Sequence, residues 1–184
     1  MIRAYIVFSL LLLPSITYAD TDLFGIWLGT SNKEWKSLPK TDRHHGQQYK
    51  SVNIIRLCKE NYFAKIPIRL RKNEEGDVYL YNKYKMIPVT GQWTIHNDTV
   101  SLKAIQIHTN KLHKKFIEAQ LEEAKQLGYE RTIQDGKITT IHKYSLQDNS
   151  LISNLNIYKH PNTYTYQKYK NNILNIDEYI SCGH

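Results

Sequence analysis

Residues 62–70 read Tyr-Phe-Ala-Lys-Ile-Pro-Ile-Arg-Leu, and this stretch decides the class of fold. Its even positions from 64 to 70 are all apolar, whereas positions 65, 67 and 69 hold two cations and a proline. A period of two is typical of a strand with one buried face. We therefore predict a strand that turns Ala64 to Leu70 toward the protein interior. Because Pro67 has no N–H to donate, we also predict a strand edge or a bulge at that residue.

The same alternation recurs on both sides of this strand. Residues 91–102 alternate around Asn97-Asp98, which tolerate positive φ and so predict a hairpin. A second hairpin is predicted at Asp135-Gly136, with Ile138 to Leu146 as its outgoing arm. Further turns are predicted at 147–150, 160–162 and 170–172, between strands near 151–158, 163–169 and 173–181. About ten antiparallel strands in sequence predict a mostly β meander that closes into a barrel or half-barrel, since closure removes exposed edges.

One helix interrupts the predicted meander, at about residues 111–127. Asn110 is a suitable N-cap and Gly128 a suitable residue after the helix end. The apolar residues between them recur at helical spacing and predict a helix that packs against the sheet or plugs it. A helix lying on a membrane surface is the alternative. The polar segment 32–50 is predicted to be a long loop, the kind that often forms a lid.

The N-terminal residues 1–19 have the pattern of a cleavable signal peptide. Arg3 supplies the positive end, Ala4 to Leu13 form a short apolar run, and small or polar residues lead to Ala19. The apolar run is shorter than the roughly 20 residues that span a bilayer. We predict cleavage after Ala19, export to the periplasm or the extracellular space, and a single domain over 20–184. An uncleaved membrane anchor is the alternative.

The cysteine count and the charge are both consistent with export. The two cysteines, Cys58 and Cys182, predict one disulfide in an exported chain, and two buried free thiols are the alternative. The chain has 25 Lys and Arg against 17 Asp and Glu, a net charge of +8. This charge favours an anionic ligand, an anionic envelope component or peripheral contact with an anionic membrane surface. Scattered lysines that only keep the protein soluble are the alternative.

Two short motifs resemble a known family. Gly25-Ile26-Trp27, near the start of the predicted domain, resembles the opening Gly-x-Trp of the lipocalin-like β-barrels. The hairpin that begins at Gly91-Gln92-Trp93 is similar to one in short bacterial lipocalin-like proteins. The resemblance implies a small calycin-type barrel whose Trp27 closes the bottom, and a function in carrying ligands. The chain lacks the Thr-Asp-Tyr segment of classical lipocalins and their C-terminal helix outside the barrel.

Residues for catalysis or metal binding do not form a recognisable pattern. The sequence contains no Gly-x-Ser-x-Gly elbow and no glycine-rich phosphate loop. Three to four converging ligands are needed for a metal, and His108, His113 and His142 would meet only in a particular fold. A nuclease with paired histidines would need His44 or His45 to face His142. We therefore predict no catalytic residue, no metal and no cofactor, and a protein that is not an enzyme.

Tyrosine is abundant, with 14 in the chain, and it suggests a binding surface. Tyr79 and Tyr81 share one predicted strand face, Tyr164 and Tyr166 share another, and lysines lie nearby. Aromatic rings edged with cations stack on flat ligands or line a pocket rim, although tyrosine is also common on half-buried strands. The predicted function is the non-catalytic binding of a small apolar or amphipathic ligand, or of an anionic envelope component. The predicted ligand-binding residues are Trp27, Tyr79, Tyr81, Trp93, Tyr164 and Tyr166.

An alternative function is a protein-interaction role. A basic, tyrosine-rich face would suit an inhibitor or immunity-type protein that binds an exported enzyme or toxin, because tyrosine supplies contact area at low entropic cost. No motif in the chain indicates a specific nucleic acid as the partner, and the sequence does not define an oligomeric state.

Overall fold

The computed structural model describes residues 23–31, 35–38, 40–41, 45–81, 87–109, 112–157, 160–170, 176 and 180–182. The predicted signal peptide and its cleavage site lie outside these residues. The elements are, in chain order, β1 (Gly25–Ser31), β2 (Lys36–Ser37), β3 (Gln48–Leu57), η1 (Lys59–Asn61), β4 (Tyr62–Lys72), β5 (Val78–Tyr81), β6 (Val89–His96), β7 (Thr99–Ile107), α1 (Lys114–Leu127), β8 (Glu130–Gln134), β9 (Lys137–Gln147), β10 (Ser150–Ile157) and β11 (His160–Lys168).

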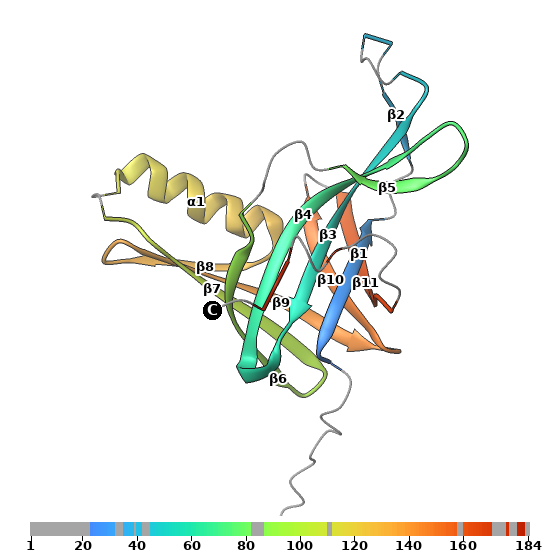
Figure 1. The fold of residues 1–184 in the computed structure, drawn as a ribbon. Helices are drawn as coiled ribbons and strands as arrows, with labels where there is room; N and C mark the ends of the chain where they lie inside the picture. Colours follow the sequence, from blue (N-terminus) through green and yellow to red (C-terminus); the bar gives the residue numbers. More distant parts are fainter. Residues whose placement is uncertain are drawn as a thin grey trace, which may run out of the picture.

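Eight of these strands form a closed antiparallel barrel (Figure 1). In chain order they are β1, β3, β4, β6, β7, β9, β10 and β11, and each pairs with the next. The last strand, β11, pairs with β1 and completes the ring. The predicted mostly β fold with one mid-chain helix is therefore confirmed, and its up-and-down order is consistent with a lipocalin-like barrel.

Two sets of strands extend beyond the ring (Figure 1). The first is the β2–β5 extension, in which β2 pairs with the start of β3 and β5 pairs with the end of β4. Pro67 lies on β4 between the residues that pair with β6 and those that pair with β5. Its missing N–H therefore falls at a local edge, as the sequence predicts. The second set consists of the end of β7, the start of β9 and β8, which pairs with β9. The helix α1 lies beside β8, and an ion pair joins the two elements, with 3.0 Å between the Arg131 guanidinium and the Glu123 carboxylate.

At the predicted tight turns the backbone has positive φ values, a conformation that only certain residue types adopt at low cost. Asn97, between β6 and β7, has a φ of 41°. Asp135 and Gly136, between β8 and β9, have φ values of 51° and 73°. Asp148 and Asn149, between β9 and β10, have φ values of 46° and 56°. Asn, Asp and Gly are the residues that adopt this left-handed region at least cost, so these three hairpins could be located from sequence.

Several predicted boundaries differ from the structure. The helix begins at Lys114, with His113 as its N-cap, instead of near residue 111, and it ends at the predicted Gly128. Residues 160–162, predicted as a turn, lie in β11 and pair with β10. The segment predicted as a long loop contains β2 and the start of β3. Of the strand predicted near 173–181, residues 176, 180 and 181 are described, and none of them is in a strand.

The prediction that Ala64 to Leu70 face the barrel interior is wrong. These residues lie on the outer face of β4, where Ile66 is opposite Ile54 of β3 and Ile68 is opposite Val52. Together with Ile26 of β1 they form an apolar cluster that also contains residues of the C-terminal segment, Ile176 and Ile180. The alternation was real, but the C-terminal segment covers this face from outside the ring.

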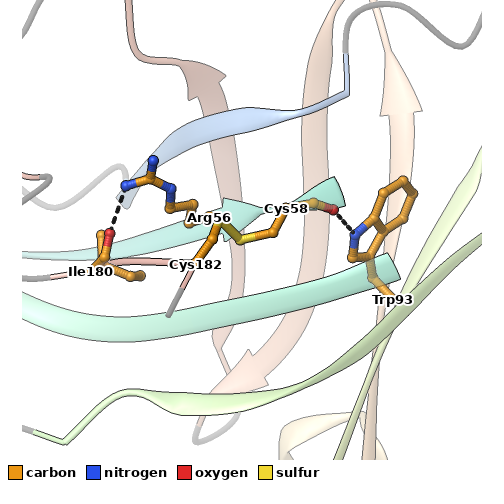
Figure 2. The surroundings of a disulfide bond; sticks show 5 residues. All are labelled: Arg56, Cys58, Trp93, Ile180 and Cys182. Atoms are coloured by element: carbon orange, nitrogen blue, oxygen red, sulfur yellow. Dashed lines mark hydrogen bonds between the residues drawn. A yellow bond between two sulfur atoms is a disulfide. The ribbon is translucent and has the colours of Figure 1, made fainter. Parts of the chain in front are cut away.

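The C-terminal segment is tied to the barrel by the predicted disulfide (Figure 2). Cys58, just after β3, is bonded to Cys182, and their Cα atoms are 5.8 Å apart. The Arg56 guanidinium donates a hydrogen bond of 2.8 Å to the carbonyl of Ile180 beside this bridge. The disulfide therefore holds the outer apolar cover against β3 and β4, and its presence is compatible with an exported protein.

Candidate functional site

The inner face of β4 is set by its pairing with β3. Ile55 and Leu57 belong to the core inside the ring, and they lie opposite Lys65 and Phe63 of β4. Residues directly opposite each other on paired strands point to the same side of the sheet. Lys65 therefore points into the barrel, and Pro67, Arg69 and Arg71 follow it on the same face.

Aromatic side chains form part of the apolar core inside the ring. Trp27 of β1 and Trp93 of β6 are buried. The rings of Phe24 and Trp93 pack edge to face, with their centroids 5.9 Å apart. Each indole N–H is satisfied, since Trp27 donates to the carbonyl of Leu23 at 2.9 Å and Trp93 to that of Cys58 at 3.0 Å. Trp27 is thus buried in the apolar core.

Four polar side chains share the inner face with this core, and we call them the interior polar cluster: Lys65 of β4, His142 and Tyr144 of β9, and Tyr166 of β11. The Lys65 ammonium donates a hydrogen bond of 2.9 Å to the Tyr144 hydroxyl oxygen. The rings of Tyr144 and Tyr166 meet edge to face, with centroids 5.4 Å apart. The cluster thus connects side chains from three strands of the ring.

The position of Tyr166 depends on a glycine. Gly29 of β1 lies opposite Tyr166, and a β-carbon at Gly29 would overlap the Tyr166 ring. The missing side chain therefore lets the ring lie flat across β1, where Tyr166 is 0% exposed. This close approach is a local reason for glycine at position 29.

Burial favours the uncharged form of every member of the cluster. Loss of hydration lowers the pKa of the Lys65 ammonium and raises the pKa values of the Tyr144 and Tyr166 hydroxyls. His142 is the clearest case, because burial first, and then the positive charges of Lys65 and Arg131, lower its pKa to about 3. As far as the structure describes the inward-facing positions of the eight strands, none holds Asp or Glu. A described carboxylate partner for Lys65 is therefore missing from this face.

Two members of the cluster have polar atoms without a partner. The Tyr166 hydroxyl and the Nδ1 atom of His142 are buried, and neither has a hydrogen-bond partner of good geometry among the described residues. Buried polar groups in native proteins are nearly always paired, so each exception calls for an explanation such as a bound molecule. The cluster can supply two to three hydrogen-bond donors and one positive charge inside the barrel.

The inner face continues onto the β2–β5 extension as alternating cations and tyrosines. Arg69 stacks on Tyr49 with 5.0 Å between the guanidinium carbon and the ring centroid, and Arg71 stacks on Tyr81 at 3.4 Å. Arg71 is only 4% exposed, and its Nε has no hydrogen-bond partner. Tyr79 donates a hydrogen bond of 2.8 Å to Gln47. This extension is therefore an aromatic and cationic surface contiguous with the barrel interior.

The structure separates the predicted ligand-binding residues into three places. Trp27 and Trp93 are in the apolar core, Tyr79 and Tyr81 are on the extension, and Tyr164 is half-buried on β11. Tyr166, expected at the rim, lies inside the polar cluster instead. Lys65, His142 and Tyr144 were not predicted as site residues. The available signal was the odd-numbered face of residues 62–70, for which the sequence analysis proposed no function.

The histidines do not assemble a metal site among the described residues, because no three His, Cys, Asp or Glu side chains converge there. His108 instead lies beside Phe116, with ring centroids 6.1 Å apart, and His142 lies beside Tyr129 at 4.7 Å. Within the described part of the chain, no helix has the length and apolarity to cross a membrane. His44, one of the histidines considered for catalysis, lies outside the described residues.

Comparison with known proteins adds no assignment to this geometry. The sequence matches no family model, and it gives no significant match among curated proteins or solved structures.

Proposed function

We propose that this chain is an exported, non-catalytic binding protein that holds a small amphipathic ligand inside its barrel. The observation that carries the proposal is the division of the interior. Apolar and aromatic core residues lie beside a polar cluster in which the Tyr166 hydroxyl and His142 Nδ1 have no hydrogen-bond partner among the described residues. A ligand with one apolar part and one polar part matches both halves.

The proposed export rests on two independent features. The N-terminal sequence has the pattern of a signal peptide, and the Cys58–Cys182 disulfide persists most readily in an oxidising compartment. The lipocalin-like opening motif supports the same proposal, since barrels of that kind carry small molecules. The ligand would therefore be encountered in the periplasm or outside the cell.

Native mass spectrometry of the protein purified from its own compartment tests this function. We expect a mass above that of the disulfide-bonded polypeptide by one small molecule, and loss of that mass on denaturation. The refolded protein should then bind a twelve-carbon amphiphile, either laurate or dodecanol, at one molecule per chain. A bare polypeptide mass together with no binding of either amphiphile would refute the proposal.

The β2–β5 extension favours a second candidate function, the binding of an exported enzyme or toxin. Its inner side presents stacked tyrosine and arginine side chains, and these residue types dominate the energetic centres of protein interfaces. In that case the same mass spectrum should show a protein partner, and Tyr81→Ala should release it. A partner that remained bound to this variant would contradict this second candidate.

A further inference from the structure

The interior polar cluster also indicates which ligands the barrel would select. The Lys65 ammonium is hydrogen-bonded inside the ring, and its described partner is the neutral Tyr144 hydroxyl at 2.9 Å. A buried cation without a counter-charge is costly, and the cost falls when an anion is placed beside it. An anionic ligand group placed beside Lys65 would therefore lower this cost.

The two unpartnered groups fit the same position. The Tyr166 hydroxyl can donate one hydrogen bond, and it belongs to a ring packed edge to face against Tyr144, to which Lys65 is bonded. His142 shares the inner face of β9 with Tyr144, and as a neutral ring its Nδ1 can carry a proton and donate. The inner faces of β4, β9 and β11 thus each contribute one potential donor to the interior polar cluster.

The ammonium of the interior polar cluster balances one negative charge, and a further inward-facing cation, Lys168 of β11, lies opposite Trp27. One ammonium in the cluster neutralises one anion, and the next cations on the inner face of β4, Arg69 and Arg71, are already on the extension. A strand advances about 3.3 Å per residue, so Arg69 starts about 13 Å further along β4 than Lys65. Surrounding core residues such as Ile55 and Trp27 are apolar and suit a hydrocarbon body.

We infer that the ligand is a monocarboxylate with an apolar body, and that its carboxylate oxygens accept hydrogen bonds from Lys65 Nζ, the Tyr166 hydroxyl and His142 Nδ1. This inference depends on the proposed function, because it assumes that the barrel binds an amphiphile. Recognition of the headgroup therefore takes place in the barrel interior instead of at the rim.

Calorimetric titration with laurate, dodecanol and dodecylamine tests the inference. The wild-type protein should bind laurate at least about tenfold more tightly than dodecanol, because a hydrogen bond to a charged group contributes about 1.5–3 kcal/mol. Dodecylamine, which repeats the charge of Lys65, should bind most weakly. Equal binding of laurate and dodecanol would overturn the carboxylate and leave the proposed function standing, whereas binding of neither would overturn both.

Variants assign the preference to the cluster. Lys65→Met should lose the preference for laurate and retain dodecanol, and Tyr166→Phe should weaken laurate alone. Lys103→Met, which removes a lysine from the outer face of β7, and Tyr62→Phe, on the outer face of β4, are the matched controls and should bind as the wild type does. Lys65→Arg keeps the charge and should retain part of the preference. An unchanged laurate preference in both Lys65→Met and Tyr166→Phe would refute the assigned site.

Discussion

The two faces of β4 differ in chemistry and in what covers them, although they alternate along the same eleven residues. The outer face, from Ala64 to Leu70, is apolar, and it is covered by the C-terminal segment that the disulfide holds in place. The inner face places Lys65 within the ring, next to buried tyrosines, with a polar hydroxyl unpartnered nearby. Burial of the outer face stabilises the fold, whereas the buried Lys65 ammonium on the inner face lowers the free energy of unfolding until a ligand neutralises its charge. Neighbouring positions on one strand should therefore respond to mutation in opposite directions.

Removing the disulfide that holds the C-terminal segment on the outer face should cause the largest change in the free energy of unfolding. Cys58→Ala/Cys182→Ala opens a link between residues 124 apart in sequence. The chain-entropy model gives a loss of about 4–5 kcal/mol in the free energy of unfolding for a loop of that size. Urea denaturation followed by tryptophan fluorescence measures it. The wild type in reductant serves as the control and should match the variant, and a loss below about 1 kcal/mol would show that the cover does not depend on the bridge.

A cavity on the outer face should have the next largest effect. Ile66 is 1% exposed in the outer cluster, so Ile66→Ala should lower the free energy of unfolding by about 2–4 kcal/mol. Ile87 is 90% exposed, and Ile87→Ala should change it by less than about 0.5 kcal/mol. Chemical denaturation of both variants makes the comparison, and similar values for the two would contradict the covered outer face.

The adjacent position should change in the other direction. Lys65→Met replaces a buried, uncompensated ammonium with an apolar side chain of similar length, and we expect the ligand-free protein to gain about 1 kcal/mol. Lys103→Met on the outer face of β7 is the control for loss of one charge. If Lys65→Met destabilised the protein instead, Lys65 would be a structural residue and the comparison between the two faces would fail.

The smallest effect should appear in the pH dependence of stability. The pKa of His142 is about 3 in the folded chain and 6.5 in an exposed histidine, so the unfolded chain binds the extra proton between these values. Stability should therefore fall as the pH drops through this window. Between pH 7 and pH 6 the wild type should lose about 0.7 kcal/mol more than His142→Gln. Parallel stability curves for the two proteins would contradict the burial of a neutral His142.

The sequence predicted much of the backbone because local chemistry determines it. Positive φ at Asn97, Asp135 and Gly136 suits those residue types, and Pro67 lies where β4 changes partners. The helix start was missed by a few residues because the cap is His113, which makes no side-chain capping bond and leaves no sequence signal.

The orientation of the strands could not be predicted in the same way. Alternation at residues 62–70 shows that one face is buried, but either side of a barrel wall can be buried when another segment covers the outside. That cover comes from Ile176 and Ile180, more than 100 residues further along the chain. The candidate site was missed for the same reason, because the sequence indicated no function for Lys65 on the polar face of the strand.

The most direct test follows the Lys65 side chain during ligand titration. In a carbon–proton correlation spectrum, the Lys65 side-chain resonance, assigned by its absence in Lys65→Met, should shift progressively and saturate at one laurate per chain. The resonance of Lys103, on the outer face of the barrel, should stay in place. A laurate titration that moved other lysines and left Lys65 unchanged would contradict ligand binding inside the barrel at this cluster.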